Sequence, residues 1–347
     1  MSVFVDIEKK IGAFHLNVQF ETGDDTLALL GASGCGKSMT LRCIAGIERP
    51  DRGRIVVNGV TLFDSAQGID LPPQQRGVGL LFQNYALFPH MTVRENIRAG
   101  ACREADRRKR EALTDDIMAR FGLTALAKQY PRELSGGEQQ RTALARIMVS
   151  APEIILLDEP FSALDSHLRF RMEQEVRTAL HAFGKTVLLV SHDRDEVFRM
   201  SDRIAVMANG AVETIGEKQQ VFEDPVTRAG ALLTGCKNIS AVTRTGADTV
   251  FAVDWGIALR VLQLTDAVTA IGIRMRQIRA GNGENSFRCR VVEEIEDPFS
   301  FTLLLRPIGA AEGNPIGWVL PKEIWTENRA EEVEISLPPE AILCLRG

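Results

Sequence analysis

The chain of 347 residues lacks the features that would place it across a membrane or send it out of the cell. No apolar run approaches the roughly 20 residues that a membrane-spanning helix needs. The first residues, MSVFVDIEKK, contain no basic segment followed by an apolar stretch and a small-residue cleavage site, so we expect no secretion signal. We therefore expect the protein to stay on the cytoplasmic side.

Paired cysteines and an excess of positive charge are also missing. The six cysteines are scattered, with no C-x-x-C pair and no histidine cluster near them, which argues against a disulfide framework and a structural metal site. The net charge of −5 argues against broad attraction to nucleic acid. One basic run, Arg107 to Arg110, has acidic residues on both sides, which favours a solvated helix face over a nucleic-acid site.

Short apolar runs bounded by turn residues recur through the first two thirds of the chain. Runs without polar alternation are typical of strands buried on both faces, as in a parallel sheet covered by helices. Two further runs, Arg54 to Val57 and Ile204 to Met207, are followed by Asn58-Gly59 and Asn209-Gly210 and predict hairpins in an antiparallel β layer. The expected parallel strands are Leu27 to Leu30, Val78 to Phe82, Ile154 to Leu157 and Val187 to Val190.

The length and the change of pattern along the chain predict two domains. We expect an α/β domain at 1–235, with a helical subdomain at about 84–150 that includes the charged, helix-forming stretch Arg103 to Phe121. From 236 to 347 short β-rich stretches alternate with Gly, Pro and acidic turns, which predicts a small β-barrel of the OB-like kind. Its expected strands are Ala247 to Val253, Ala270 to Ile273, Arg288 to Val292, Phe301 to Leu305 and Gly317 to Leu320.

A phosphate-binding loop follows the first of the expected parallel strands. The sequence GASGCGKS fits G-x-x-x-x-G-K-S, between a strand and a helix that opens at Met39. In such a loop the backbone N–H groups surround a phosphate, Lys37 reaches the β- and γ-oxygens, and Ser38 offers a hydroxyl to Mg²⁺. We interpret Cys35 as a small filler. The expected nucleotide contacts of this segment are Gly31, Ala32, Ser33, Gly34, Cys35, Gly36, Lys37, Ser38 and Met39.

Polar residues follow three other expected strands. Because the carboxyl ends of parallel strands meet at one edge of a sheet, we expect these residues to lie together at a ligand site. In IILLDEP, Asp158 is expected to hold Mg²⁺, and Glu159 to polarise the water that attacks the γ-phosphate. Gln83 is expected to touch Mg²⁺ and that water, and His192 to bond the γ-phosphate and orient Glu159.

The octapeptide LSGGEQQR, Leu134 to Arg141, contains an S-x-x-E capping box formed by Ser135 and Glu138. Gly136 and Gly137 leave the first helical turn without side chains, so an anion could approach its N–H donors and the positive end of the helix dipole. The pattern by itself is equally compatible with an ordinary helix start.

Taken together and in this order, the phosphate loop, Gln83, LSGGEQQR, ILLDEP, SALD (Ser162 to Asp165) and His192 resemble the nucleotide-binding subunit of an ATP-binding cassette (ABC) transporter. The resemblance covers about residues 1–235. It implies an ATPase that uses ATP and Mg²⁺ and forms a head-to-tail dimer, with each ATP held between the phosphate loop of one copy and Ser135, Gly136 and Gly137 of the other. Asp165 would lie at that dimer interface.

Met39 differs from the residue usual in that family, and the residue that stacks on adenine is not fixed by a motif. Met39 stands where a threonine commonly follows the loop serine, which removes one hydroxyl contact to the α-phosphate. The aromatic residue that stacks on adenine has one nearby upstream candidate, Phe14.

The resemblance extends to importers built from separate subunits. The segment Asn84 to Ile97 would line the groove for a membrane permease, although Tyr85, Leu87 and Phe88 could equally belong to the core. An extracytoplasmic solute-binding protein would act indirectly, and the chain would sit peripherally on the cytoplasmic face of the membrane. No nucleic-acid partner is expected.

The cargo is suggested by residues 62–76, LFDSAQGIDLPPQQR, which resemble molybdate-importer ATPases. Another solute, such as sulfate, tungstate, a polyamine or a sugar, is the alternative, and a soluble non-transport cassette protein is a third. In the C-terminal domain Lys237, Asn238 and Ser240 offer donors to a tetrahedral oxyanion, although a turn at the start of a domain is the more ordinary interpretation.

Overall fold

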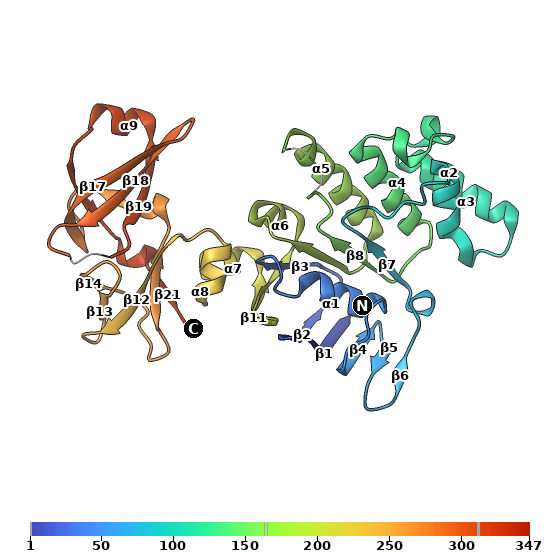
Figure 1. The fold of residues 1–347 in the computed structure, drawn as a ribbon, viewed down its shortest axis with the longest axis horizontal. Helices are drawn as coiled ribbons and strands as arrows, with labels where there is room; N and C mark the ends of the chain where they lie inside the picture. Colours follow the sequence, from blue (N-terminus) through green and yellow to red (C-terminus); the bar gives the residue numbers. More distant parts are fainter. Residues whose placement is uncertain (1, 163, 165, 311–312) are drawn as a thin grey trace. The chain divides into compact units, whose positions relative to one another are not determined.

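A computed structural model describes residues 2–162, 164, 166–310 and 313–347. The chain folds as two compact units, Met1–Lys218 and Gln219–Gly347 (Figure 1). Each unit has its own apolar core. Within the described residues, no helix is both long and apolar enough to cross a membrane.

The first unit is built on one eleven-stranded sheet of the described residues, in the order β6-β5-β4-β1-β2-β11-β10-β3-β9-β8-β7. Its strands are β1 (Val3–Ile11), β2 (Phe14–Thr22), β3 (Thr26–Gly31), β4 (Arg52–Val57), β5 (Val60–Asp64), β6 (Ile69–Asp70), β7 (Val78–Leu81), β8 (Ile154–Asp158), β9 (Val187–Ser191), β10 (Arg203–Ala208) and β11 (Ala211–Glu217).

The predicted parallel strands are confirmed. The strands β7, β8, β9 and β3 pair in parallel with one another, and β10 pairs in parallel with β3. Every residue of β8 and β9 is buried, which explains why their sequences show no polar alternation. The carboxyl ends of these strands form a single edge of the sheet, where the expected site residues follow.

The two predicted hairpins are also confirmed, as β4–β5 and β10–β11. Their turns place Asn58 and Asn209 at positive φ, each followed by a glycine at positive φ, which is the geometry of a type I′ turn. An antiparallel part of the sheet contains β1, β2, β4 and β5. It joins the rest of the sheet where β2 pairs with β11, through Asn17 and Ala211.

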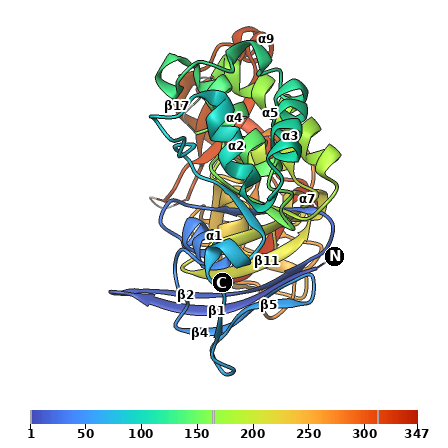
Figure 2. The same ribbon diagram turned by 90° about the vertical axis from the view of Figure 1, so that its right-hand side faces the viewer.

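Helices of the first unit are α1 (Lys37–Ala45), α2 (Val93–Gly100), α3 (Arg107–Arg120), α4 (Gly136–Met148), α5 (Ser166–Phe183) and α6 (Arg194–Met200). The helices α2, α3 and α4 share a small apolar core that includes Val93, Ile97, Ile117 and Ala145. Figure 2 shows these helices on one side of the unit and β1, β2 and β4 on the other. The expected helix within Arg103 to Phe121 is α3.

The second unit begins within α7 (Lys218–Glu223) and contains α8 (Arg228–Leu233), α9 (Lys322–Glu327) and, among the described residues, two five-stranded antiparallel sheets. It is an antiparallel half-barrel consistent with the expected OB-like domain, and Trp255, Trp318 and Trp325 lie in its core. Its strands are β12 (Asn238–Arg244), β13 (Thr249–Ala252), β14 (Ile257–Arg260), β15 (Ala270–Ile273), β16 (Arg279–Ala280), β17 (Ser286–Glu296), β18 (Ser300–Pro307), β19 (Ile316–Pro321), β20 (Glu332–Ser336) and β21 (Leu343–Leu345).

Candidate nucleotide site

The phosphate loop connects β3 to α1 and requires glycine at its turns. Gly34 and Gly36 have φ of 81° and 104°, which side chains disfavour. A Cβ on Gly31 would lie 2.5 Å from the Sγ of Cys35, so the buried thiol fills the space inside the loop, as expected of a filler. No side chain caps α1, which leaves its first-turn N–H groups available to an anion.

Lys37 is buried within this loop. Its ammonium donates to the carbonyl oxygens of Gly31 at 2.7 Å and Ala32 at 2.9 Å. A buried ammonium next to uncapped helix N–H groups is a favourable place for a phosphate group. Ser33 is exposed, and Met39 is half-buried against the core of the sheet.

Ser38 and Asp158 come together at the end of β8. The Ser38 hydroxyl donates to Oδ1 of Asp158 over 2.6 Å. Burial raises the pKa of Asp158 above its ordinary value, partly offset by the bond from Ser38 and the charge of Arg42. Within the described residues, no group of three His, Cys, Asp or Glu side chains could hold a metal alone. Mg²⁺ suits this pair, because it usually takes one or two protein oxygens together with phosphates and waters.

Glu159 and His192 meet at the same edge. The Nδ1 atom of His192 lies 3.2 Å from Oε1 of Glu159. The backbone of Glu159 has φ of 46°, held by the bond of its N–H to the Val190 oxygen (3.0 Å) and by the Ser162 hydroxyl, which donates to the Glu159 oxygen (2.9 Å). Strained backbone of this kind is common at functional sites.

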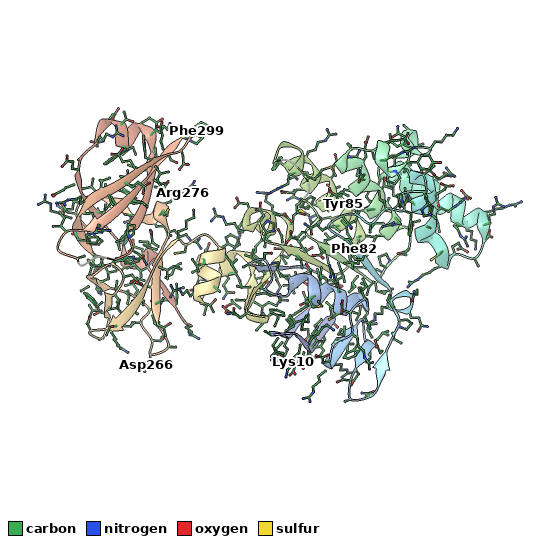
Figure 3. The ribbon with its side chains drawn as sticks, viewed as in Figure 1. Lys10, Phe82, Tyr85, Asp266, Arg276 and Phe299 are labelled. Atoms are coloured by element: carbon green, nitrogen blue, oxygen red, sulfur yellow. The ribbon has the colours of Figure 1, made fainter. Side chains whose placement is uncertain are left out.

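Gln83 lies in a turn directly after β7, and its side chain is exposed. The turn is closed by the N–H of Tyr85, which donates to the Phe82 oxygen over 2.9 Å (Figure 3). Tyr85, Leu87 and Phe88 could line a groove or belong to the core, and their burial differs. Tyr85 is buried, Leu87 is half-buried, and Phe88 is 41% exposed with the guanidinium of Arg146 over its ring.

The capping box of α4 is confirmed. The N–H of Ser135 donates to Glu138 over 2.8 Å, and the N–H of Glu138 donates to the Ser135 hydroxyl over 3.4 Å. The Ser135 hydroxyl also donates to the Glu138 carboxylate over 2.7 Å, and this bond, together with the bond from the Ser135 N–H, lowers the pKa of Glu138. The glycines also serve packing, because a Cβ on Gly137 would lie 2.9 Å from Sδ of Met172. Among the described residues, no hydrogen bond joins Ser135, Gly136 or Gly137 to the phosphate loop of the same chain.

The ring of Phe14 lies beside the phosphate loop, where a Cβ on Gly36 would approach its Cζ to 3.2 Å, and its contact with adenine stays a prediction. Asp165 lies outside the described residues.

The turn expected at the start of the C-terminal domain is wrong for Asn238 and Ser240, because both residues lie in strand β12. Both are buried. The side-chain amide of Asn238 donates to the Gly317 oxygen and accepts from the Gly317 N–H, each over 2.7 Å, and the Ser240 hydroxyl donates to the Ala241 oxygen. Their polar groups are therefore already bonded within the fold.

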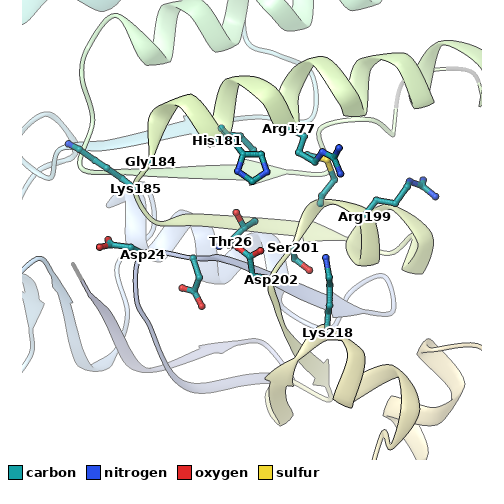
Figure 4. Close-up of a pocket in the computed structure, with 13 residues that line it drawn as sticks. Asp24, Thr26, Arg177, His181, Gly184, Lys185, Arg199, Ser201, Asp202 and Lys218 are labelled. Carbon is teal, nitrogen blue, oxygen red and sulfur yellow. Dashed lines mark hydrogen bonds between the residues drawn. The ribbon is translucent and has the colours of Figure 1, made fainter.

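Residues that the sequence did not single out surround this edge. Arg169 donates to Asp193 over 3.1 Å and to the Leu164 oxygen over 3.3 Å. Glu196 of α6 is buried. A separate polar pocket of about 200 Å³ lies at the opposite, amino ends of β3, β9 and β10, with His181 and Lys218 among its lining residues (Figure 4). None of its lining residues is among the expected nucleotide contacts.

Similarity to known proteins extends over much of the chain. A family model described as "ABC transporter" matches residues 14–162. The spermidine/putrescine import ATP-binding protein PotA of Nitratidesulfovibrio vulgaris is 43% identical over 228 residues, covering 65% of this chain and 60% of the relative. The Fe(3+) ions import ATP-binding protein FbpC 1 of Rhizobium meliloti is 39% identical over 279 residues, covering 78% of this chain and 75% of the relative.

The molybdenum import ATP-binding protein ModC of Rhodospirillum rubrum is 39% identical over 221 residues, covering 64% of this chain and 60% of the relative. A solved dimeric structure of the ATP-binding cassette MJ0796 bound to ADP and Pi is similar at a TM-score of 0.53 and 27% identity, over 63% of this chain and 99% of that one. The chain belongs to the ABC transporter family, among its import-type ATP-binding proteins. The match spans about 60% of the length of the first polyamine relatives.

Proposed function

We propose that the chain is the ATP-hydrolysing subunit of an ABC importer. The observation that carries the proposal is the pairing of Ser38 with Asp158 and of His192 with Glu159 at one edge of the sheet, next to Lys37. Residues 1–235 would be the nucleotide-binding domain, with a helical subdomain at about 84–150. Residues 236–347 would be a regulatory or oxyanion-binding domain.

In this proposal the phosphate loop and Lys37 bind the phosphates of ATP, and Phe14 stacks on adenine. Ser38, Asp158 and Gln83 would hold Mg²⁺, which would neutralise charge on the phosphate oxygens. Glu159 takes a proton from the water aligned with the γ-phosphate. His192 fixes the direction of the Glu159 carboxylate through Nδ1, and in its doubly protonated form it donates a hydrogen bond from Nε2 to the γ-phosphate.

A second copy of the chain would complete each site. The N-terminus of α4 is bare at Gly136 and capped by Ser135, so it can receive the γ-phosphate bound to the partner's loop. The dimeric form of the MJ0796 cassette supports a dimer, and the head-to-tail order of its two copies is part of this proposal. The other partners would be membrane permeases at the cytoplasmic face, with a solute-binding protein acting from outside.

For the cargo, the similar proteins favour a polyamine, since several of them are spermidine/putrescine or putrescine import proteins. Molybdate is the second candidate, supported by residues 62–76 and by the molybdenum relative. Transport assays with the permease subunits and labelled putrescine or molybdate decide between them. Calorimetric titration of the chain with molybdate, tungstate and sulfate tests the C-terminal domain separately.

The hydrolysis itself is tested with the purified full chain. We expect Mg²⁺-dependent release of phosphate from ATP, lost in Lys37→Ala and on removal of Mg²⁺ by EDTA. A tagged chain should recover membrane permease subunits from solubilised membranes. Recovery of ribosomes or DNA without a permease would contradict the transporter assignment, and hydrolysis unaffected by Lys37→Ala would contradict the site.

A further inference from the structure

Arg146 lies in the last turn of α4, and backbone oxygens hold its guanidinium. Nη2 donates to the oxygen of Tyr85 over 3.1 Å, and Nη1 donates to the oxygen of Ala86 over 2.8 Å. Burial lowers the pKa of Arg146, and no ion pair with a carboxylate is found for it in the described part of the chain. A desolvated cation held in this way has a strong geometric preference for these carbonyls.

The backbone that Arg146 holds is strained. Tyr85 and Ala86 are consecutive non-glycine residues with φ of 59° and 44°. Such residues stay in the left-handed region only when their surroundings impose it. The turn that they end is the turn that carries Gln83. Loss of the guanidinium would therefore let this turn relax and Gln83 move.

Asn96 of α2 holds the next part of the same loop. Its buried amide donates to the oxygens of Phe88 (3.1 Å) and Met91 (3.0 Å), and its Oδ1 accepts from the Phe88 N–H at 2.9 Å and from Arg146 at 3.4 Å. One turn further along α2, a Cβ on Gly100 would lie 2.0 Å from the Arg146 oxygen. This close approach of α2 to α4 keeps Asn96 beside the guanidinium.

We propose that Arg146, supported by Asn96, is a positioning residue for ATP hydrolysis that acts through Gln83. The inference rests on the proposed function. Arg146 is ten residues after Gly136, so α4 carries it about 15 Å from the helix N-terminus. Because the helix is rigid, a shift at Ser135 when the partner's nucleotide binds moves Arg146, and Arg146 moves the Gln83 turn. The helix α4 thereby links Ser135, which faces the nucleotide on the partner's phosphate loop, to Gln83 in the site built on its own chain's phosphate loop.

The first test replaces the forked guanidinium by a point charge. In the full chain, Arg146→Lys should lower kcat by about tenfold to a hundredfold, since a misplacement of about 1 Å can cost that much. The nucleotide Kd should stay within about twofold, because the phosphate loop is untouched. The matched control is Arg110→Lys, another arginine that donates to a backbone oxygen, that of Glu104, and it should keep the parental kcat.

The second test is a double-mutant cycle with Gln83→Ala. If Arg146 acts through Gln83, Arg146→Lys has little further effect on kcat in the Gln83→Ala background, whereas full additivity would overturn the inference. Asn96→Asp, which removes the amide donors, should give the same pattern and serves if Arg146→Lys folds poorly by thermal melting. Absence of hydrolysis in the parental chain, or no loss in Gln83→Ala, would count against the proposed function instead.

Discussion

The imidazole of His192 lies with Nδ1 3.2 Å from Oε1 of Glu159, on a carboxylate whose own backbone is strained at φ of 46°. The histidine side chain is 59% exposed and the glutamate side chain only 20%. The pair therefore leaves much of the imidazole open to solvent and keeps the carboxylate in a sheltered position. This arrangement suits a base whose direction, more than its basicity, controls the attack of water.

Removal of the carboxylate charge tests that role. Glu159→Gln keeps the size of the side chain and its hydrogen bonding to His192, so ATP binding should survive while kcat falls by about 100-fold or more. ATP-bound dimers should accumulate and be visible by gel filtration with ATP and Mg²⁺. Unchanged hydrolysis in this variant would refute the assignment of Glu159 as the base.

A substitution at Asp158 should lower ATP hydrolysis without lowering the stability of the fold. Its pKa is raised by burial, so the folded chain disfavours the ionised form and loses stability as pH rises above the unfolded value. Asp158→Asn retains an acceptor for the Ser38 hydroxyl without that charge. We expect an equal or higher melting temperature without nucleotide, together with an about 100-fold loss of Mg²⁺-dependent hydrolysis. A clear drop in melting temperature would show that the charge stabilises the fold.

Glu196 gives the chain a pH dependence of stability. Burial raises its pKa to about 8 from 4.5, and among the described residues its Oε1 has no hydrogen-bond partner. The folded chain then keeps a proton that the unfolded chain releases, so this group lowers stability as pH rises from about 5 to about 8. Glu196→Gln should flatten that decline and add about 1 to 3 kcal/mol at pH 8.

Melting temperatures measured across this pH range check the prediction, with Asp195→Asn as the control, because Asp195 is the exposed neighbour on α6. The control should show the parental slope. Equal slopes in the parental chain and in Glu196→Gln would mean that Glu196 is ionised in the folded state.

Much of the cassette fold could be predicted, because the central parallel strands β3, β8 and β9 are short apolar runs buried on both faces and each of the two predicted hairpin turns has a glycine after asparagine. The site residues follow those runs at fixed offsets, so Ser38 and Asp158 could be predicted to meet from chain order alone. The pairing of His192 with Glu159 followed in the same way. Local sequence was sufficient there because the sheet edge brings the strand ends together.

The supporting residues could not be predicted by that route. Arg146 is an arginine within an otherwise apolar turn of α4, and its partners are carbonyl oxygens, which no side-chain pattern reveals. Glu196 looks like an ordinary helix acid until the packing of α6 buries it. In the second unit β12 was missed, because Asn238 and Ser240 were assigned to a turn although their polar groups are satisfied inside the fold.

The central claim, a nucleotide site shared between two copies, is tested most directly by mixed dimers in a Glu159→Gln background, which keeps bound ATP from being hydrolysed. When Lys37→Ala is on one copy and Ser135→Arg on the other, both changes fall in one shared site, and each dimer should retain a single occluded ATP after gel filtration. When both changes are on the same copy, both shared sites are damaged and no ATP should be retained. The reverse pattern would contradict the account, because it would mean that each chain builds its nucleotide site alone.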